Sequence, residues 1–252
     1  MIDISSGYLN GADMLAEGLG DEVMALFEAE HLKTRYLSHG KPFSPFEDVS
    51  FFLEAGGVYD LTGPSGSGKT TLLRVCARLL PKTAGTLRLN GQDSDGMSPV
   101  AWRRQVCLVP QQSVLVPGTV GDNLRLPWTL KVNAGITPPA DEELQALLDA
   151  VDLNEVSCHT DASQLSGGQQ ARVALLRAFV THPKVLLLDE VDAGLDDESA
   201  KAVGLLCRSV AQKEGSAVLR IRHRPPDGFA TATFVLAQGV MSRREAAGGD
   251  KS

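Results

Sequence analysis

Hydrophobic and polar positions alternate along this chain with two different periods. From residue 32 to residue 62 the pattern is that of β-strands, with apolar side chains at every second position at Val49, Phe51 and Leu53. Short apolar runs predict strands at Val58–Thr62, Thr86–Leu89, Val106–Val109, Lys184–Leu188 and Ala217–Ile221. Apolar residues three and four positions apart predict helices at Lys69–Leu80, Asp141–Val151, Gly167–Val180 and Asp197–Lys213.

The order of these elements indicates an α/β fold. Strands that alternate with helices form mostly parallel sheets, because a parallel connection needs a crossover. The stretch from residue 119 to residue 180 departs from this alternation and is mainly helical. We therefore expect a mostly parallel sheet with an inserted helical lobe at about residues 115–180.

The two ends of the sequence differ from this core. Residues 1–30 are rich in Gly, Asp and Glu, and we expect an acidic, loosely ordered leader. An amphipathic helix that binds a partner is the alternative, and Met24 is a candidate start of the natural chain. Residues 242–252 are polar and are expected to be disordered. The apolar residues of the leader fall at roughly helical spacing: Met14, Leu15, Leu19, Val23, Met24, Leu26 and Phe27.

Composition narrows the class of protein. The 252 residues are 43% hydrophobic and carry a formal net charge of −7, which argues against a nucleic-acid partner. The longest apolar runs are far short of the ~20 residues that span a bilayer, and the N-terminus lacks a basic and then apolar signal pattern. We expect a cytoplasmic protein whose membrane role, if it has one, depends on a partner. The cysteines have no CxxC spacing and are expected to be reduced: Cys76, Cys107, Cys158 and Cys207.

A glycine-rich segment lies between a predicted strand and a predicted helix. It fits the phosphate-loop pattern GxxxxGK[ST], in which glycines let backbone N–H groups converge on phosphate oxygens at a helix start. Lys69 is expected to reach the β- and γ-phosphates of a nucleotide, and Thr70 to hold Mg²⁺ through its hydroxyl group. The expected nucleotide-binding residues here are Gly63, Pro64, Ser65, Gly66, Ser67, Gly68, Lys69, Thr70 and Thr71.

A second motif ends a buried strand in two carboxylates. After the run Val185–Leu188, Asp189 is suited to hold Mg²⁺ through water, and Glu190 to orient or deprotonate an attacking water molecule. Two adjacent carboxylates near a bound phosphate would be costly without a cation. The phosphate loop and this strand together predict an Mg-nucleotide site.

A third motif opens the helix predicted at Gly167–Val180. The pentapeptide Leu165-Ser166-Gly167-Gly168-Gln169 places Ser166 as an N-cap and leaves backbone amides free at the two glycines. Simple helix capping is the alternative interpretation. The full pentapeptide, followed by Gln-x-Arg-Val-Ala, is specific.

With these three motifs in this order, residues 30–240 resemble the nucleotide-binding subunits of ABC (ATP-binding cassette) transporters. The resemblance implies a P-loop NTPase core with an antiparallel β subdomain, within a domain at residues 31–241. It also assigns Gln111 as the glutamine that contacts Mg²⁺ and water, with Gln112 as the competing register. His223 lies 33 residues after Glu190 and matches the histidine that contacts the γ-phosphate.

The resemblance assigns two further parts. Tyr36 corresponds to the aromatic residue that stacks on adenine, with Phe43 as the alternative. The segment 193–196 corresponds to the loop that crosses the dimer interface. Ser166, Gly167, Gly168 and Gln169 would bind the γ-phosphate of ATP held by a second copy.

The implied function is ATP hydrolysis between two head-to-tail copies, with ATP and Mg²⁺ bound at their interface. Dimer closure would power a separate integral membrane subunit, which docks near the Gln111 loop and the helical lobe. The protein would then be peripheral on the inner face of the cell membrane. The alternative is a soluble ABC ATPase of iron–sulphur cluster assembly. The segment 119–130, "TVGDNLRLPWTL", also resembles small ATPase subunits of iron or metal exporters, with packing of Pro127 and Trp128 in the lobe core as the competing explanation.

Some positions depart from the family pattern. Val191 and Asp192 stand where Pro-Thr is usual, which adds a charge next to Glu190 and is expected to alter its environment. Arg220, Arg222 and Arg224 surround His223 where many relatives have Thr-His-Asp. Because the arginines share one face of a strand, we expect them on a solvated face, with a phosphate or partner contact as the alternative.

Overall fold

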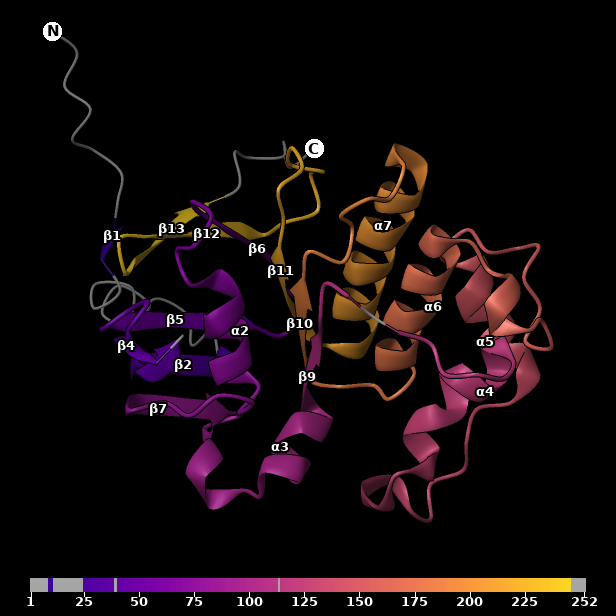
Figure 1. Cartoon of the computed structure of the whole chain (residues 1–252), viewed down its shortest axis with the longest axis horizontal. Helices are drawn as coiled ribbons and strands as arrows, with labels where there is room; N and C mark the ends of the chain where they lie inside the picture. Colours follow the sequence, from indigo (N-terminus) through magenta and orange to yellow (C-terminus); the bar gives the residue numbers. More distant parts are fainter. Residues whose placement is uncertain (1–8, 11–24, 39, 113, 246–252) are drawn as a thin grey trace, which may run out of the picture.

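The structure is a computed structural model that describes residues 9–10, 25–38, 40–112 and 114–245. Its central sheet separates two groups of elements (Figure 1). One group is an antiparallel sheet with helix α2, Lys69–Cys76, and the other is a set of helices on the opposite face. None of the helices in these described ranges combines the length and hydropathy that crossing a bilayer requires.

The central sheet has the strand order β1-β13-β12-β6-β11-β10-β9. Strands β12, β6, β11, β10 and β9 run parallel, whereas β13 and β1 add antiparallel pairing at one edge. Every residue of β10 and β11 is buried, as expected for strands covered on both faces. The strands are β1, Leu9–Asn10; β6, Val58–Thr62; β9, Val106–Val109; β10, Val185–Asp189; β11, Ala217–Ile221; β12, Ala232–Ala237; and β13, Val240–Glu245.

The antiparallel sheet has the order β5-β2-β7-β8 and packs its apolar face toward α2. Phe27 and Phe51 lie 6.0 Å apart between ring centroids, and Leu72 and Leu73 of α2 join the same buried cluster. This cluster fixes the position of the helix that follows the phosphate loop. The strands are β2, Ala25–Lys33; β5, Val49–Glu54; β7, Ala84–Leu89; and β8, Gln92–Asp93. A hairpin of β3, Tyr36–Ser38, and β4, Lys41–Phe43, extends from this region.

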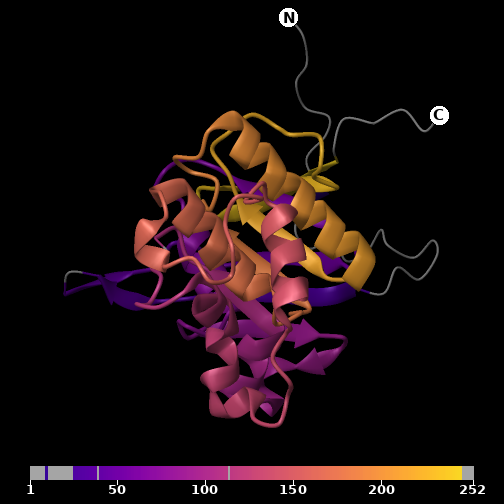
Figure 2. The ribbon, with the colours of Figure 1, turned by 90° about the vertical axis from the view of Figure 1, so that its right-hand side faces the viewer.

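The helices on the other face form a second buried cluster with β9, β10 and β11. Figure 2 shows this side, where α7 lies across the sheet and the helices of the lobe lie beside it. The helices are α4, Val120–Arg125; α5, Asp141–Asp149; α6, Gly167–Phe179; and α7, Asp197–Glu214. Helix α3, Pro99–Gln105, leads into β9. Short 3₁₀ turns occupy Ser94–Gly96, Leu126–Thr129, Lys131–Asn133 and Ala162–Gln164.

Parts of the expected leader and tail belong to the sheets. Residues 25–30 form the first part of β2, where Leu26 and Phe27 are buried, so the helical spacing and the loose leader are wrong for this stretch. Pairing of β2 with both β5 and β7 buries alternate residues and overrides the local pattern. Residues 242–245 extend β13 and are not disordered. Met14, Leu15, Leu19, Val23, Met24 and residues 246–252 lie outside the described residues.

Element boundaries differ in small ways elsewhere. Helix α2 ends at Cys76, four residues before the predicted end at Leu80, and a turn follows with Arg78 at φ 53°. Strands β12 and β13 and helix α3 were not predicted, whereas the hairpin of β3 and β4 lies within the stretch from residue 32 to residue 62 that was expected to form strands. Within the stretch that was expected to be mainly helical, two short 3₁₀ turns lie between Leu126 and Asn133.

Candidate nucleotide site

The phosphate loop joins β6 to α2 in a conformation that requires its glycines. Gly63 has φ 141°, and a Cβ there would lie 2.1 Å from the Leu236 carbonyl oxygen. Gly68 has φ 97°, and a Cβ there would lie 2.7 Å from Pro45 Cβ. Gly68 is also the N-cap of α2, and no side chain caps this helix start. The loop therefore presents backbone N–H groups that an anion can bind.

Two polar side chains of the loop face inward. Lys69 is 7% exposed, and its Nζ donates to the carbonyl oxygens of Gly63 at 2.9 Å and Pro64 at 3.0 Å. Ser67 Oγ is buried without a hydrogen-bond partner among the described residues. A buried hydroxyl without a partner is costly, so it fits a site where a ligand oxygen accepts its hydrogen bond.

Thr70 and Asp189 meet at the end of β10. Thr70 Oγ1 donates to Asp189 Oδ1 at 3.0 Å. Burial raises the pKa of Asp189; the Thr70 hydrogen bond lowers it and the charge of Glu190 raises it further. A carboxylate that loses solvation beside another carboxylate is stabilised by a cation, and the oxygen donors here are those that Mg²⁺ prefers. The oxygen atoms of the predicted ligands Thr70 and Asp189 are therefore suited to bind Mg²⁺. Gln111, the third predicted ligand, contacts Glu190, the residue that follows Asp189.

Glu190 contacts two other predicted site residues, Gln111 and His223. Its Oε2 accepts a hydrogen bond from Gln111 Nε2 at 2.9 Å, and its Oε1 lies 2.9 Å from His223 Nε2. Glu190 itself has φ 52°, an uncommon conformation for a residue other than glycine that often marks a functional position. Gln111 makes this contact, which favours it over Gln112 as the site glutamine.

Glu190 and His223 line a pocket of about 300 Å³ together with part of the phosphate loop, whereas Gln111 and Asp189 are not among its lining residues. Both candidate aromatic residues line it: Tyr36 and Phe43 pair across β3 and β4, with ring centroids 5.7 Å apart at 74°. The Tyr36 hydroxyl lies 3.2 Å from Thr71 Oγ1. The pocket is lined by Tyr36, Phe43, Ser65, Gly66, Gly68, Lys69, Thr70, Thr71, Glu190 and His223.

The signature segment lies on a different part of the molecule. Ser166 caps α6 through its Oγ, which accepts from Gln169 N at 3.3 Å, and Gln169 Oε1 accepts from Ser166 N at 2.9 Å. A Cβ at Gly167 would meet nothing within 4 Å, and one at Gly168 would meet only Leu195 Cδ2 at 3.6 Å. Ser166, Gly167, Gly168 and Gln169 do not line the nucleotide pocket. Ser166 therefore does cap the helix, as the alternative interpretation expected, and the space over Gly167 is open.

The arginines near His223 are a correction to the sequence analysis. Arg220 and Arg222 are 3% and 7% exposed, so the expected solvated face is wrong for both. Arg220 Nε donates to Asp60 Oδ1 at 2.8 Å, and Arg222 Nε donates to Asp192 Oδ2 at 2.9 Å. Asp192 therefore contacts an arginine. Arg220 and Asp60 occupy paired positions on the neighbouring strands β11 and β6, and the sequence alone did not indicate this pairing.

Asp227 completes this buried charge cluster. Its Oδ2 lies 3.0 Å from Arg220 Nη1 and 2.8 Å from Arg222 Nη1. Burial raises the pKa of Asp227, but hydrogen bonds and charge from Arg220 outweigh it, and the net pKa lies below its usual value. Buried charges are tolerated when they are paired, and here Arg220 and Arg222 each donate at least one hydrogen bond to a carboxylate.

Comparisons with known proteins agree on one family. The ABC transporter domain family matches residues 46–193. The chain is 34% identical over 176 residues to the Probable iron export ATP-binding protein FetA of Escherichia coli, which covers 70% of this chain and 76% of FetA. It is also 34% identical to the Methionine import ATP-binding protein MetN of Desulfitobacterium hafniense, over 79% of this chain. The chain spans 58% of the length of that relative.

Solved structures show the same fold. A dimeric post-hydrolysis state of the ATP-binding cassette MJ0796 bound to ADP and Pi aligns with a TM-score of 0.75 at 23% identity, covering 88% of this chain and all of that chain. A bacterial Atm1-family ABC exporter with ATP bound aligns with a TM-score of 0.72 at 25% identity, covering 86% of this chain and 38% of that chain. The predicted fold class is confirmed: a P-loop NTPase core with a mostly parallel sheet, an antiparallel β subdomain and a helical lobe.

Proposed function

The chain belongs to the ABC transporter family and is an ATPase cassette of that family, and we propose that it hydrolyses Mg-ATP between two copies to power a separate membrane subunit. The observation that carries the proposal is the position of Glu190. It lies at the pocket formed with the phosphate loop, and Gln111 and His223 contact its two carboxylate oxygens. This arrangement holds a carboxylate where a water molecule attacking the γ-phosphate would be oriented.

The residues have separate roles in the proposed reaction. Lys69 leaves the Gly63 and Pro64 carbonyl oxygens to bind the β- and γ-phosphates, and the loop amides bind the remaining oxygens. Glu190 orients the attacking water or accepts its proton, and His223 contacts the γ-phosphate. Thr70, Asp189 and Gln111 would hold Mg²⁺, which supplies positive charge that stabilises the transferred phosphoryl group. Tyr36 stacks on adenine, and the ring of Phe43 packs at a steep angle against the ring of Tyr36.

A second copy would complete the site. The exposed helix start at Ser166–Gln169 contributes nothing to the pocket of its own chain. The space over Gly167 is open, and Gly194 has φ 79° with no atom within 4 Å of a Cβ placed there. We assign both to the facing copy: Ser166–Gln169 binds the γ-phosphate of the other copy's ATP, and segment 193–196 crosses the interface. Two solved structures of the MJ0796 cassette are dimeric, one of them bound to ADP and Pi.

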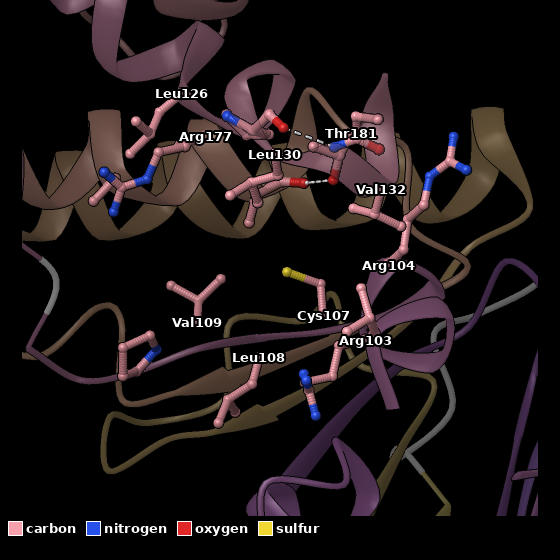
Figure 3. Close-up of a pocket in the computed structure, with 16 residues that line it drawn as sticks. Arg103, Arg104, Cys107, Leu108, Val109, Leu126, Leu130, Val132, Arg177 and Thr181 are labelled. Atoms are coloured by element: carbon pink, nitrogen blue, oxygen red, sulfur yellow. Dashed lines mark hydrogen bonds between the residues drawn. The ribbon is translucent and has the colours of Figure 1, made fainter. Parts of the chain in front are cut away.

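A groove beside the Gln111 loop is the proposed dock for the membrane subunit. It has a volume of about 620 Å³ and lies between β9 with α3 and the helical lobe. Figure 3 shows Cys107, Leu108 and Val109 on one side, with Leu126, Leu130, Val132 and Arg177 on the other. The lining is mainly apolar, with Arg103, Arg104 and Arg177 among it. Pro110 lines the groove and Gln111 follows it directly, so an occupant of the groove would adjoin the segment that contacts Glu190.

The proposed location is the cytoplasmic face of the cell membrane, through that subunit. A metal ion as cargo is the finer part of the proposal, supported by the resemblance of residues 119–130 and by the match to FetA. The MetN relative has the same identity and is named for methionine import. Pro127 lines the groove and Trp128 packs against the second buried cluster, so the Pro-Trp pair also has a structural role.

A soluble ATPase of iron–sulphur cluster assembly is the competing function. It would use the same catalytic residues and fill the groove with a soluble scaffold protein. The experiment that separates the two is a mild-detergent pull-down from native membranes with tagged Glu190→Gln and Mg-ATP, followed by mass spectrometry. We expect one multi-span protein, and recovery of soluble proteins alone would contradict the transporter proposal.

The cargo is tested on a complex of the wild-type chain with the membrane protein that the pull-down identifies. Reconstituted in vesicles, the complex is assayed for phosphate release with Fe²⁺ and with methionine, each supplied on either side of the membrane. Stimulation by Fe²⁺ supports the metal cargo, and stimulation by methionine alone contradicts it. Lys69→Ala in the same vesicles reports the rate that does not come from this subunit.

A further inference from the structure

His223 lies between two arginines that both contact the segment after Glu190. The parallel pairing of β10 with β11 ends at Asp189 opposite Ile221, and Glu190 N donates to the Ile221 carbonyl oxygen at 3.2 Å. Beyond this point the backbone ladder stops, while Glu190 Oε1 and His223 Nε2 lie 2.9 Å apart. Side-chain contacts connect the two segments here.

Arg222 makes the first of these connections. Its Nε donates to Asp192 Oδ2 at 2.9 Å, and its Nη1 lies 2.8 Å from Asp227 Oδ2. Asp192 is 6% exposed and follows Glu190 by two residues. A charge-assisted hydrogen bond in this dry environment has fewer competing partners than one at the surface, so its geometry is well defined.

Arg224 makes the second connection. Its Nη1 donates to Asp197 Oδ1 at 2.6 Å, and its Nη2 donates to the Leu195 carbonyl oxygen. Asp197 opens α7, whose N-cap Asp196 accepts a hydrogen bond from Ser199 N at 2.8 Å. Arg224 thus ties the residue after His223 to the start of a long, well-capped helix.

The three residues contact different partners. Arg222 and Arg224 bind Asp192, Asp197 and the Leu195 carbonyl oxygen, whereas His223 Nε2 lies 2.9 Å from Glu190 Oε1. His223 lines the nucleotide pocket, whereas neither arginine does. Anchoring both neighbours of His223 away from the pocket leaves the histidine directed toward Glu190.

We propose that Arg222 and Arg224 form an arginine clamp that positions His223 by tying residues 222–224 to residues 192–197. The clamp makes these two segments move as one unit, so that Glu190 and His223 keep their separation when ATP binds and leaves. Both arginines are positioning residues. The inference rests on the proposed function, because it assigns the clamp to the hydrolysis step.

The balance of positive and negative charges in the buried cluster decides which variants are expected to fold and can be tested. The buried cluster holds three carboxylates, Asp60, Asp192 and Asp227, against Arg220 and Arg222. Removal of Arg222 would leave three carboxylates with one arginine, which is expected to prevent folding. Asp192→Ala leaves two carboxylates with two arginines and breaks only the contact to the segment after Glu190. Arg224→Ala acts nearer the surface, where the arginine side chain is 28% exposed.

The experiment is steady-state hydrolysis of Mg-ATP by the full chain. For Asp192→Ala and for Arg224→Ala we expect kcat to fall by about tenfold, with KM changed by less than about twofold, because the reacting groups are misplaced while nucleotide contacts remain. Asp192→Asn keeps an oxygen that accepts from Arg222 Nε and is expected to retain most of the wild-type kcat. Arg125→Ala is the matched control: Arg125 also donates to a backbone carbonyl oxygen, that of Pro139, and to a carboxylate, Asp141.

The clamp is expected to act only through His223, which a double substitution tests. In a His223→Ala background, Arg224→Ala should cause no further loss in the single-turnover rate, measured over long incubations. The same further loss in both backgrounds would overturn the proposal, as would wild-type kcat in Asp192→Ala and Arg224→Ala. If Asp192→Ala does not fold, Arg224→Ala decides the matter alone. Absence of phosphate release by the wild-type chain would contradict the proposed function. Normal release by the wild-type chain and by both variants would contradict the clamp alone, so the two failures are distinguishable.

Discussion

Helices α2 and α6 both begin at glycine-rich segments, but the two segments differ in how they cap the first backbone N–H groups of the helix. At α2 the N-cap is Gly68 in a left-handed conformation, and no side chain satisfies the first amides. At α6 the N-cap is Ser166, which forms a full capping box with Gln169. Lys69 after the first start is buried, whereas Ser166 and Gly167 at the second are exposed.

The glycines of the two segments differ in whether the fold of the chain itself requires glycine at their positions. A side chain at Gly63 or Gly68 would collide with atoms of the same chain, so the fold itself requires glycine there. At Gly167 the chain leaves open space, so nothing in its own fold excludes a side chain. The first start is built for a ligand enclosed by one chain. The second has its own amides partly satisfied and an open approach, which is the geometry expected for contact with a separate body.

The largest effect should come from the first helix start. Lys69→Ala removes the side chain that lies beside the phosphate loop, and we expect hydrolysis to fall by about 100-fold or more, because a positioned cation that stabilises transferred charge is lost. Phosphate release at saturating Mg-ATP measures this. Lys82→Ala is the control, since Lys82 pairs with Asp95 away from the pocket. A variant that kept a third of the wild-type rate would contradict the assignment of the phosphate loop.

A pair of glycine substitutions tests the contrast directly. Gly63→Ala places a Cβ against the Leu236 carbonyl oxygen at φ 141°, and should lower the free energy of unfolding by about 3 kcal/mol or more. Gly167→Ala should leave that free energy within about 0.5 kcal/mol of the wild-type value, because alanine suits a helix and meets no atom. Urea unfolding followed by circular dichroism measures both. Equal destabilisation would remove the distinction between the two helix starts.

A smaller effect concerns the thiols near each start. Burial raises the pKa of Cys76 in α2 and of Cys158, which lies before the signature segment. Because the thiolate is the nucleophile, alkylation of both should be slow near pH 7.5 and should quicken by up to ~10-fold per pH unit. Cys158 should react faster, since Cys76 is fully buried. Mass spectrometry after iodoacetamide treatment measures the two rates.

Nucleotide sharpens that comparison. Mg-ATP should slow alkylation of Cys76, because binding stabilises the part of the chain that holds the phosphate loop, and should leave Cys158 nearly unchanged. Protection of Cys158 without protection of Cys76 would contradict the assignment of the nucleotide to the phosphate loop of the same chain.

The sequence predicted those parts of the site whose geometry is local. The loop from Gly63 to Thr70 and the strand ending in Asp189 and Glu190 carry their structure in a few neighbouring residues. The meeting of Gln111 and His223 at Glu190 followed from the family pattern, because parallel strands bring their carboxyl ends to one edge of the sheet. Their roles in hydrolysis stay predictions.

The parts that were missed depend on contacts far apart in the chain. Arg220 looked solvent-facing in its own segment, and its burial is tolerable because it pairs with Asp227 and with Asp60, which lies on a strand 160 residues earlier. Residues 25–30 looked like a leader because their strand pattern is clear only when β5 and β7 lie on either side. Local periodicity cannot report such long-range pairing.

The central claim is that the second helix start serves the nucleotide of another copy. The most direct measurement is the mass of Glu190→Gln by size-exclusion chromatography with light scattering, with saturating Mg-ATP and without nucleotide. Slowed hydrolysis should keep ATP at the interface, so we predict a dimer with Mg-ATP that returns to monomer when ATP is removed or when Gly167→Val is added. A Glu190→Gln chain that stays monomeric with saturating Mg-ATP would contradict the account.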